Sequence, residues 1–244
     1  MGNNQLLKTL IYSKLIYVAS LTPVPGWVYE ELEKVVLDFF WRGRPKIKKS
    51  IMFLEYKDGG LKMMHFPSLI DAQRLIWVRR LFQGKEDMKW KQYFEEATKQ
   101  IGGKFIFSCN YSIGRLNVSI PDFYVDMLEV WAKTREFRRI FDYIGREVFL
   151  NNENISIDGE MVYNERLHSK DLFRLEHIID RNGDLKPVHF FLSKGLNLMD
   201  VLNIRYIYGV VPLSWKRDMN SSNLDSNSNI ESTTFIIKGN EITL

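Results

Sequence analysis

The fold of this sequence is decided around Phe39-Phe40-Trp41-Arg42-Gly43-Arg44-Pro45-Lys46-Ile47-Lys48-Lys49. An aromatic helix end leads here into a segment with five basic residues in eight, where glycine and proline oppose helix formation. Positive charge and flat aromatic faces are the two ingredients that hold a nucleic-acid backbone and its bases. A solvated loop between two core helices is an equally simple interpretation of the same residues.

Two helices are predicted before the basic segment. Apolar residues recur at helical spacing in residues 4–20 and again in residues 27–40, and the prolines between them end the first helix. A short connection predicts that the two helices pack as an antiparallel hairpin. The inward stripe of the first helix is expected to comprise Leu7, Leu10, Ile11, Leu15 and Val18.

Beyond the basic segment, residues 51–54 and 61–65 are predicted to form two short strands joined by a turn at Gly59-Gly60. A helix is predicted from Ser68 to Phe82, because Ser68 and Asp71 have the spacing of a helix start. The inward residues of this helix are expected to be Ala72, Leu75, Ile76 and Leu81, and another face is expected to carry Arg74, Trp77 and Arg80.

The rest of the chain predicts further short helices. They are expected at residues 88–101, 121–145, 171–179, 188–192 and 198–211, with β-like pieces over 104–120 and a tight hairpin at 155–162. From Met219 the sequence is polar and of low complexity, which predicts disorder apart from a short β-prone segment. The expected fold class is therefore mainly α with short β-hairpins, divided into residues 1–84, 85–217 and 218–244.

Composition and charge place the chain among folded globular proteins. Hydrophobic residues make up 45% and aromatic residues 14% of its 244 residues. Residues 1–50 hold eight lysines and arginines against four acidic residues, an excess that equals the whole net charge of +4. A basic surface is therefore expected near the N-terminal end.

Cysteine usage and hydropathy limit the cellular location that the sequence predicts. The single cysteine, Cys109, excludes an internal disulfide and a thiolate zinc site, and it fits a reducing compartment. No stretch has the pattern of a secretory signal or the length and purity of a transmembrane helix. The expected location is intracellular, nuclear and/or cytoplasmic, without a membrane partner.

The sequence lacks the patterns of common catalytic and metal sites. Phosphoryl transfer by a polymerase needs metal ions held by clustered carboxylates, and no Asp-Asp pair occurs in the chain. The four histidines lack a Glu-flanked pair and a cysteine partner, so they are interpreted as ordinary surface residues. Gly59-Gly60 and Gly102-Gly103 lack a phosphate-loop context and are interpreted as turns. No catalytic, cofactor-binding or metal-binding residue is therefore predicted.

Several blocks, taken in order over roughly residues 5 to 217, resemble a known family. They are Lys8 to Tyr17 followed by Pro23-Val24-Pro25, Phe39-Phe40-Trp41 with Gly43, Lys57-Asp58-Gly59-Gly60-Leu61, Ala72 with Trp77 and Arg80-Leu81, Leu150 to Ile155, Asp180 to Leu185, and Tyr206 to Lys216. Each block is unspecific alone, but the ordered set resembles the region after the catalytic palm in reverse transcriptases of non-LTR (LINE-type) retrotransposons. The cysteine-rich C-terminal segments of that family have no counterpart here.

The resemblance implies a helical thumb in residues 1–84 and a post-palm connector in residues 85–217. It also implies that these parts hold nucleic acid without catalysing a reaction. The implied partner is an RNA–DNA or RNA template–primer, held weakly and without sequence preference, together with the missing palm and endonuclease parts. Mg²⁺ is implied for the missing palm alone. The implied nucleic-acid-binding residues are Trp41, Arg42, Arg44, Lys46, Lys48, Lys49, Arg79 and Arg80. For Trp41 a core position, and for Arg79 and Arg80 plain solvation, stay open as alternatives.

A second interpretation is a truncated orphan remnant that acts as a helical protein-interaction module or has no selected role. The start at Met1, inside what resembles a thumb helix, and the Ser/Asn-rich tail are expected of a truncated copy.

Overall fold

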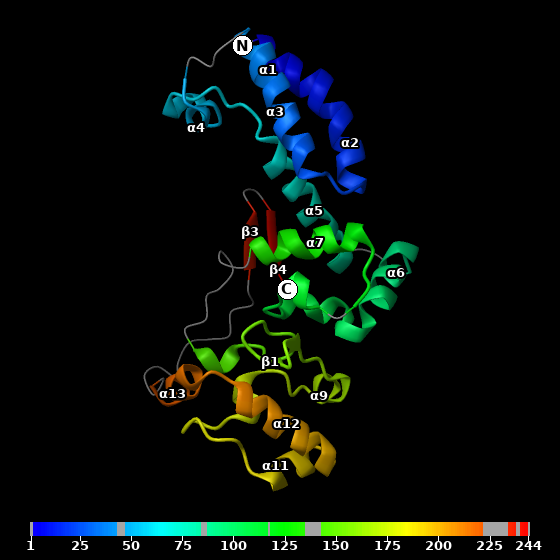
Figure 1. The fold of residues 1–244 in the computed structure, drawn as a ribbon, viewed down its shortest axis with the longest axis vertical. Coiled ribbons are helices and arrows are strands. Elements are labelled where there is room, and N and C mark those ends of the chain that lie inside the picture. Colours follow the sequence, from blue (N-terminus) through cyan, green and yellow to red (C-terminus); the bar gives the residue numbers. More distant parts are fainter. Residues whose placement is uncertain are drawn as a thin grey trace. The chain divides into compact units, whose positions relative to one another are not determined.

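The structure, a computed structural model, describes residues 2–42, 47–83, 87–116, 118–134, 143–221, 234–237 and 240–243. It is mainly helical, as the sequence predicts, and its described strands form two-stranded antiparallel hairpins (Figure 1). The chain divides into two compact units: unit 1 comprises residues 1–84 and 122–130, and unit 2 comprises residues 85–121 and 131–244. The three-part division expected from the sequence stays a prediction.

Unit 1 is built on a helical hairpin. Its first arm is continuous and comprises α1 (Gly2–Leu6), the π-helical segment η1 (Leu7–Tyr12) and α2 (Ser13–Leu21). The second arm is α3 (Gly26–Trp41), which packs back against the first arm in the predicted antiparallel sense (Figure 1). The unit is completed by α4 (Lys49–Met52), η2 (Tyr56–Asp58), α5 (Phe66–Phe82) and residues 122–130 of α7 (Asp122–Lys133).

The π-helical segment rotates the apolar face of the first arm. Leu7, Tyr12 and Ala19 are buried, whereas Leu10, Leu15 and Val18 are exposed, so the expected inward stripe is wrong at those three positions. Side-chain hydroxyls that donate to carbonyls one turn earlier compete with the helix ladder, and π-helical insertions shift its register. Regular 3.6-residue spacing therefore assigns the wrong side chains to the core.

Aromatic side chains close the core of unit 1 between the hairpin and α5. The Tyr12 and Phe66 rings stack with centroids 5.7 Å apart, and Tyr29 meets Phe66 at 6.0 Å. Burial in this core raises the pKa of the Tyr12 hydroxyl, and the nearby Glu33 carboxylate adds to the increase. Asn4 donates to the Leu61 carbonyl at 2.8 Å, which connects the start of the chain to the loop before α5.

The predicted strands at residues 51–54 and 61–65 are wrong. Residues up to Met52 are helical in α4, because a short apolar run fits a buried helix turn as well as a strand. The two segments still lie side by side: the Lys62 amide donates to the Leu54 carbonyl at 2.8 Å, and the Met63 amide to the Met52 carbonyl at 2.9 Å. Gly60 permits this approach, since a Cβ there would lie 2.1 Å from the Leu54 carbonyl oxygen.

Helix α5 begins two residues before the predicted start. The His65 ring and the Ser68 hydroxyl are hydrogen-bonded at 2.7 Å across the first turn, and proline occupies one of the first helical positions, where its missing amide costs nothing. The predicted inward face is also wrong in part, because residues 72 and 76 are exposed although Leu81 is fully buried. The buried residues of α5 are Phe66, Ile70, Arg74, Val78 and Leu81.

Unit 2 consists of short helices connected by compact turns. Its helical elements are α6 (Lys89–Thr98), η3 (Lys99–Ile101), η4 (Gly103–Ser108), η5 (Ile113–Arg115), the end of α7, η6 (Ile144–Arg146), α9 (Glu165–Ser169), α10 (Leu175–Ile178), α11 (Val188–Ser193), α12 (Leu198–Val210) and α13 (Leu213–Ser221). Two hairpins accompany them: β1 (Ser156–Ile157) pairs with β2 (Glu160–Met161), and β3 (Thr234–Ile237) pairs with β4 (Asn240–Thr243).

The predicted hairpin at residues 155–162 is confirmed. Asp158 and Gly159 both have positive φ, at 53° and 84°, as a two-residue turn between antiparallel strands requires. The predicted β-like pieces over residues 104–120 are wrong, because the described residues of that segment form the 3₁₀ helices η4 and η5 and irregular connections, without a strand. The helix predicted at 171–179 shortens to α10, since Asp171 has a φ of 56°, outside the helical region.

The structure also differs from the sequence predictions in the helix expected at 121–145 and in the C-terminal tail. The helix predicted at 121–145 is α7, which ends at Lys133, and residues 135–142 lie outside the described residues. In the tail predicted to be disordered, α13 extends to Ser221 and a hairpin occupies part of residues 234–243, whereas residues 222–233 lie outside the described residues.

The core of unit 2 combines aromatic packing with buried amides. The Trp131 indole donates to the Phe107 carbonyl at 2.7 Å, and the rings of Phe94 and Phe107 stack 5.6 Å apart. Asn152 is fully buried and donates to the Glu147 carboxylate at 2.9 Å and to the Val148 carbonyl. These side chains satisfy polar groups that loop backbone would otherwise leave unpaired away from water.

In the described part of the chain, no helix combines the length and the apolar character that crossing a bilayer requires.

Candidate functional site

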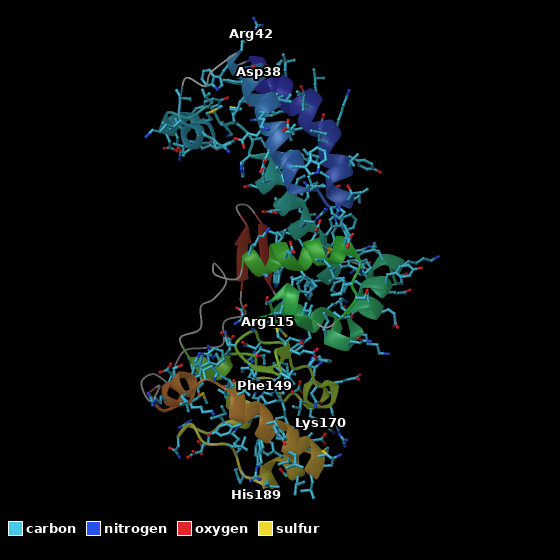
Figure 2. The ribbon with its side chains drawn as sticks, viewed as in Figure 1. Asp38, Arg42, Arg115, Phe149, Lys170 and His189 are labelled. Atoms are coloured by element: carbon cyan, nitrogen blue, oxygen red, sulfur yellow. The ribbon has the colours of Figure 1, made fainter. Side chains whose placement is uncertain are left out.

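The C-terminal end of α3 presents the first of the predicted basic residues. Arg42 caps this helix in the left-handed conformation, with φ of 49°, and its amide donates to the Asp38 carbonyl at 2.7 Å. Its side chain is exposed and lies at the extremity of the unit (Figure 2). Arg44 and Lys46 lie outside the described residues, so their predicted role stays a prediction.

Lys48 and Lys49 follow at the start of α4, and both are exposed. The Lys49 ammonium forms an ion pair with the Glu33 carboxylate in the middle of α3, which connects the start of α4 to α3. About half of the Lys49 side chain still faces solvent, and an exposed pair of this kind contributes at most about 1 kcal/mol. Lys49 can therefore exchange its carboxylate for a phosphate at small cost, whereas Lys48 has no ionic partner among the described residues.

Trp41 belongs to the packing of unit 1. Its ring meets Phe40 edge-on with centroids 5.1 Å apart, and it packs against the hydrophobic core. Its indole N–H is buried without a hydrogen-bond partner in the described part of the structure. The core position that the sequence left open is thus the observed one, and stacking on a base would require Trp41 to leave this packing.

Arg79 and Arg80 lie in the last turn of α5, where the helix dipole favours cations. Arg79 donates from Nε to the side-chain oxygen of Gln83 at 2.9 Å, and the Arg80 guanidinium lies 4.9 Å from the centroid of the Trp77 ring. Trp77 also meets Phe123 of α7 edge-on at 5.6 Å. These two arginines are therefore partly engaged within unit 1.

The described residues of the predicted site do not all lie together in unit 1. Helix α5 runs parallel to the first arm, because Phe66 near its start stacks on Tyr12 whereas Arg74, two turns later, reaches Ser20 and Thr22. Helix α3 runs the other way, so its C-terminal end lies beside α1 (Figure 1). Arg42 is therefore separated from Arg79 and Arg80 by the length of the helical hairpin, whereas the Lys49 ammonium lies beside Glu33 in the middle of α3.

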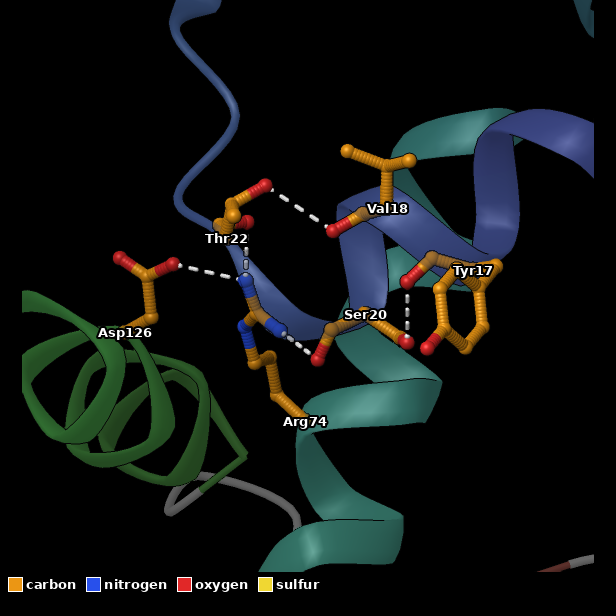
Figure 3. A network of polar contacts seen from close by, with 6 residues as sticks. All are labelled: Tyr17, Val18, Ser20, Thr22, Arg74 and Asp126. Carbon is orange, nitrogen blue, oxygen red and sulfur yellow. Dashed lines mark hydrogen bonds and ion pairs between the residues drawn. The ribbon is translucent and has the colours of Figure 1, made fainter.

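Arg74 is a buried cation that sequence reasoning placed on the wrong face. Its side chain is 1% exposed and donates from its two terminal nitrogens to the carbonyls of Ser20 and Thr22, the latter at 2.7 Å (Figure 3). One of these nitrogens also contacts the Asp126 carboxylate at 3.0 Å. The last carbonyls of a helix lack intrahelical partners and attract cations. Arg74 thus holds the end of α2 and α7 against α5.

A signal for Arg74 was present in the sequence. Phe66, Ile70, Arg74 and Val78 recur every four residues, which puts the arginine inside an apolar helical stripe. A single cation in such a stripe is buried when carboxylates and free carbonyls meet it. The surrounding geometry supplies both, so Arg74 has a structural role and is not a further phosphate ligand.

Unit 2 contains an open hollow of about 630 Å³ next to a tyrosine–histidine pair. The Tyr163 hydroxyl and the His168 Nδ1 atom are 3.0 Å apart. Burial lowers the pKa of His168, which keeps its ring neutral at pH 7, and burial raises the pKa of the Tyr163 hydroxyl. The charged residues that line the hollow are Lys91, Glu95, Glu96, Lys99 and Glu165. Because they mix both signs, the hollow favours neither an anion nor a cation.

The expectation that the histidines are ordinary surface residues is wrong for two of them. His168 packs against the Phe105 ring with centroids 4.1 Å apart, and His177 accepts the amides of Phe173 and Arg174 at 3.4 Å. Burial is the main cause that lowers the pKa of both rings. Among the described residues, no group of three or more histidine, cysteine, aspartate or glutamate side chains is arranged to hold a metal ion.

Comparisons with known proteins add no relative. No protein-family model, no curated protein and no solved structure matches this chain.

Proposed function

We propose that unit 1 is a non-catalytic grip for a nucleic-acid backbone, the role that the resemblance to a non-LTR reverse-transcriptase thumb implies. The observation that carries the proposal is the set of exposed cations Arg42, Lys48 and Lys49, which lie at the C-terminal end of α3 and at the start of α4. Cations on exposed, flexible side chains contact phosphates without reading sequence. On this proposal the full-length element would supply the palm and the endonuclease elsewhere.

The rigidity of the hairpin supports this function. Arg74 holds the closed end of the hairpin through carbonyl and carboxylate contacts, and the aromatic core fixes α5 beside it. A fixed scaffold presents these cations without a large loss of backbone freedom on binding. Three phosphate contacts are few, so we expect a dissociation constant on the order of micromolar or weaker.

Fluorescence anisotropy with a labelled RNA–DNA hybrid tests the proposal. The double variant Arg42→Glu with Lys48→Glu reverses two of the exposed cations and should weaken binding at least about tenfold, since each phosphate contact is lost and a repulsion added. The matched control is Lys89→Glu with Lys133→Glu, which changes the net charge equally on exposed residues of unit 2. Equal weakening by both double variants, or no binding by the native chain, would contradict the proposal.

A protein-interaction module is the second candidate. Tyr17 and Val18 of α2 and Trp27 and Val35 of α3 are 57% to 71% exposed, an unusual apolar surface for two neighbouring helices. The anisotropy measurement separates the two candidates, because an apolar interaction surface would leave hybrid binding absent.

A further inference from the structure

One cation of the proposed grip has an anionic partner within the chain. The Lys49 ammonium, at the start of α4, forms an ion pair with the Glu33 carboxylate of α3. Arg42 and Lys48 are exposed, and neither forms an ion pair among the described residues. The three cations are therefore not equally available to a phosphate, and Lys49 is the one whose binding position is occupied.

The Glu33 carboxylate has a fixed position, whereas its partner is mobile. Glu33 projects from α3 at the edge of the aromatic core, where burial raises the pKa of the Tyr12 hydroxyl and the Glu33 charge raises it further. Its side chain is 36% exposed, and that of Lys49 is 54% exposed. A lysine ammonium lies at the end of a flexible four-carbon chain. Lys49 can therefore leave the pair while the carboxylate stays in place and recaptures it later.

This pair opposes a phosphate in either of two arrangements. If Lys49 keeps its contact with Glu33, an arriving phosphate lies close to a carboxylate, and like charges repel. If Lys49 turns to the phosphate, the pair must first be broken. The cost of breaking an exposed pair is small, but it is subtracted from the binding free energy of the phosphate contact.

We propose that Glu33 is an internal competitor for the phosphate position at Lys49, and that it weakens the nucleic-acid grip. The inference rests on the function proposed above and adds a regulatory contact to the same site. Binding at Lys49 is then an exchange of one anion for another at a single ammonium. Arg42 and Lys48 bind phosphates without such an exchange.

Fluorescence anisotropy with the labelled RNA–DNA hybrid tests this proposal in the full chain at low ionic strength. Glu33→Gln removes the competing charge and keeps the size of the side chain. It should tighten binding about three- to fivefold, which is the factor that corresponds to an exposed ion pair. A residue that positioned Lys49 for binding would give the opposite sign.

Glu31→Gln is the matched control. Glu31 lies on the same helix and pairs with Lys34 at 2.7 Å, so its replacement changes the net charge equally and also frees a lysine. Residues two positions apart on a helix do not face each other, so Glu31 lies on a different side from Glu33. Because salt and water screen charges at a distance, this variant should change the affinity less than about twofold.

Lys49→Gln provides a second and independent measurement. In that background Glu33→Gln should lose most of its gain, because the ammonium for which the two anions compete is absent. A gain of the same size with and without Lys49 would assign the effect to general repulsion and overturn the competitor role.

Failure of this inference is distinguishable from failure of the grip. If the native chain binds the hybrid and Arg42→Glu with Lys48→Glu weakens it, the grip stands. Equal effects of Glu33→Gln and Glu31→Gln, or weaker binding by Glu33→Gln, would then overturn the competitor role alone. If the native chain and Glu33→Gln both fail to bind the hybrid, the grip and the competitor are overturned together.

Discussion

Replacement of Arg74 by leucine should destabilise unit 1 by about 3 kcal/mol. Removing one member of a buried, hydrogen-bonded ion pair typically costs about 3–5 kcal/mol, because the partners are left without a donor. The partners of Arg74 are not equally shielded: the Asp126 side chain is 27% exposed and Thr22 lies at the surface, so water can replace the arginine at both. The half-buried Ser20 carbonyl loses a charge-assisted bond with less compensation. The expected loss therefore lies at the lower end of the range.

Urea unfolding measures this loss. Tryptophan fluorescence reports on both units, because Trp27, Trp41 and Trp77 lie in unit 1 and three further tryptophans lie in unit 2, so assigning a transition to unit 1 takes a local readout. Hydrogen exchange of residues 13–29 gives a local readout, since opening of the hairpin end should exchange those amides faster in the variant.

The control is Arg80→Leu on the same helix. Arg80 is exposed and its cation–π contact with Trp77 is worth about 1 kcal/mol at most, so this variant should lose little stability. A loss below about 1 kcal/mol for Arg74→Leu, or equal losses for both variants, would refute the role of Arg74 as the anchor of the hairpin.

Three further predictions concern the turn, the core amide and the histidines. Gly60→Ala should lower the urea midpoint of unit 1, since its Cβ would lie 2.1 Å from the Leu54 carbonyl oxygen, and an unchanged midpoint would contradict this close approach. Asn152→Ala should cost unit 2 about 1–3 kcal/mol in the same assay, because buried polar partners lose their donor, and a loss near zero would count against the buried network. Unit 2 should lose stability as the pH falls below about 6.5, because burial lowers the pKa of His168 and His177 in the folded state and protons then bind the unfolded chain more readily. Urea midpoints at several pH values check this, and His177→Gln should flatten the dependence.

The sequence predicts the helical hairpin well because its determinants are local. Apolar spacing and the proline turn fix two helices without reference to the rest of the chain, and Asp158-Gly159 fixes a hairpin in the same way. The strand predicted at residues 51–54 fails because four apolar residues fit a buried helix turn equally well. That choice is made by tertiary contacts such as the approach of Gly60 to Leu54.

The candidate site is predictable in composition but not in geometry. The count of cations in residues 42–49 follows from the sequence, whereas the ion pair between Lys49 and Glu33 depends on how α3 and α4 pack. The separation of Arg79 from Arg42 likewise depends on the parallel course of α5 and the first arm. The spacing of apolar residues in α12 does not predict which side of the helix is exposed, because a helix that is apolar all round gives no preferred side.

The salt dependence of hybrid binding tests the central proposal most directly. Each phosphate contact on a duplex contributes about −0.9 to the slope of log K against log salt concentration. Contacts from Arg42, Lys48 and Lys49 predict a slope of about −2.7, which becomes about −4.5 if Arg44 and Lys46 also engage. The double variant Arg42→Glu with Lys48→Glu should make the slope shallower by about 1.8. A slope near zero in the native chain, or the same slope in the variant, would contradict a phosphate grip by these side chains.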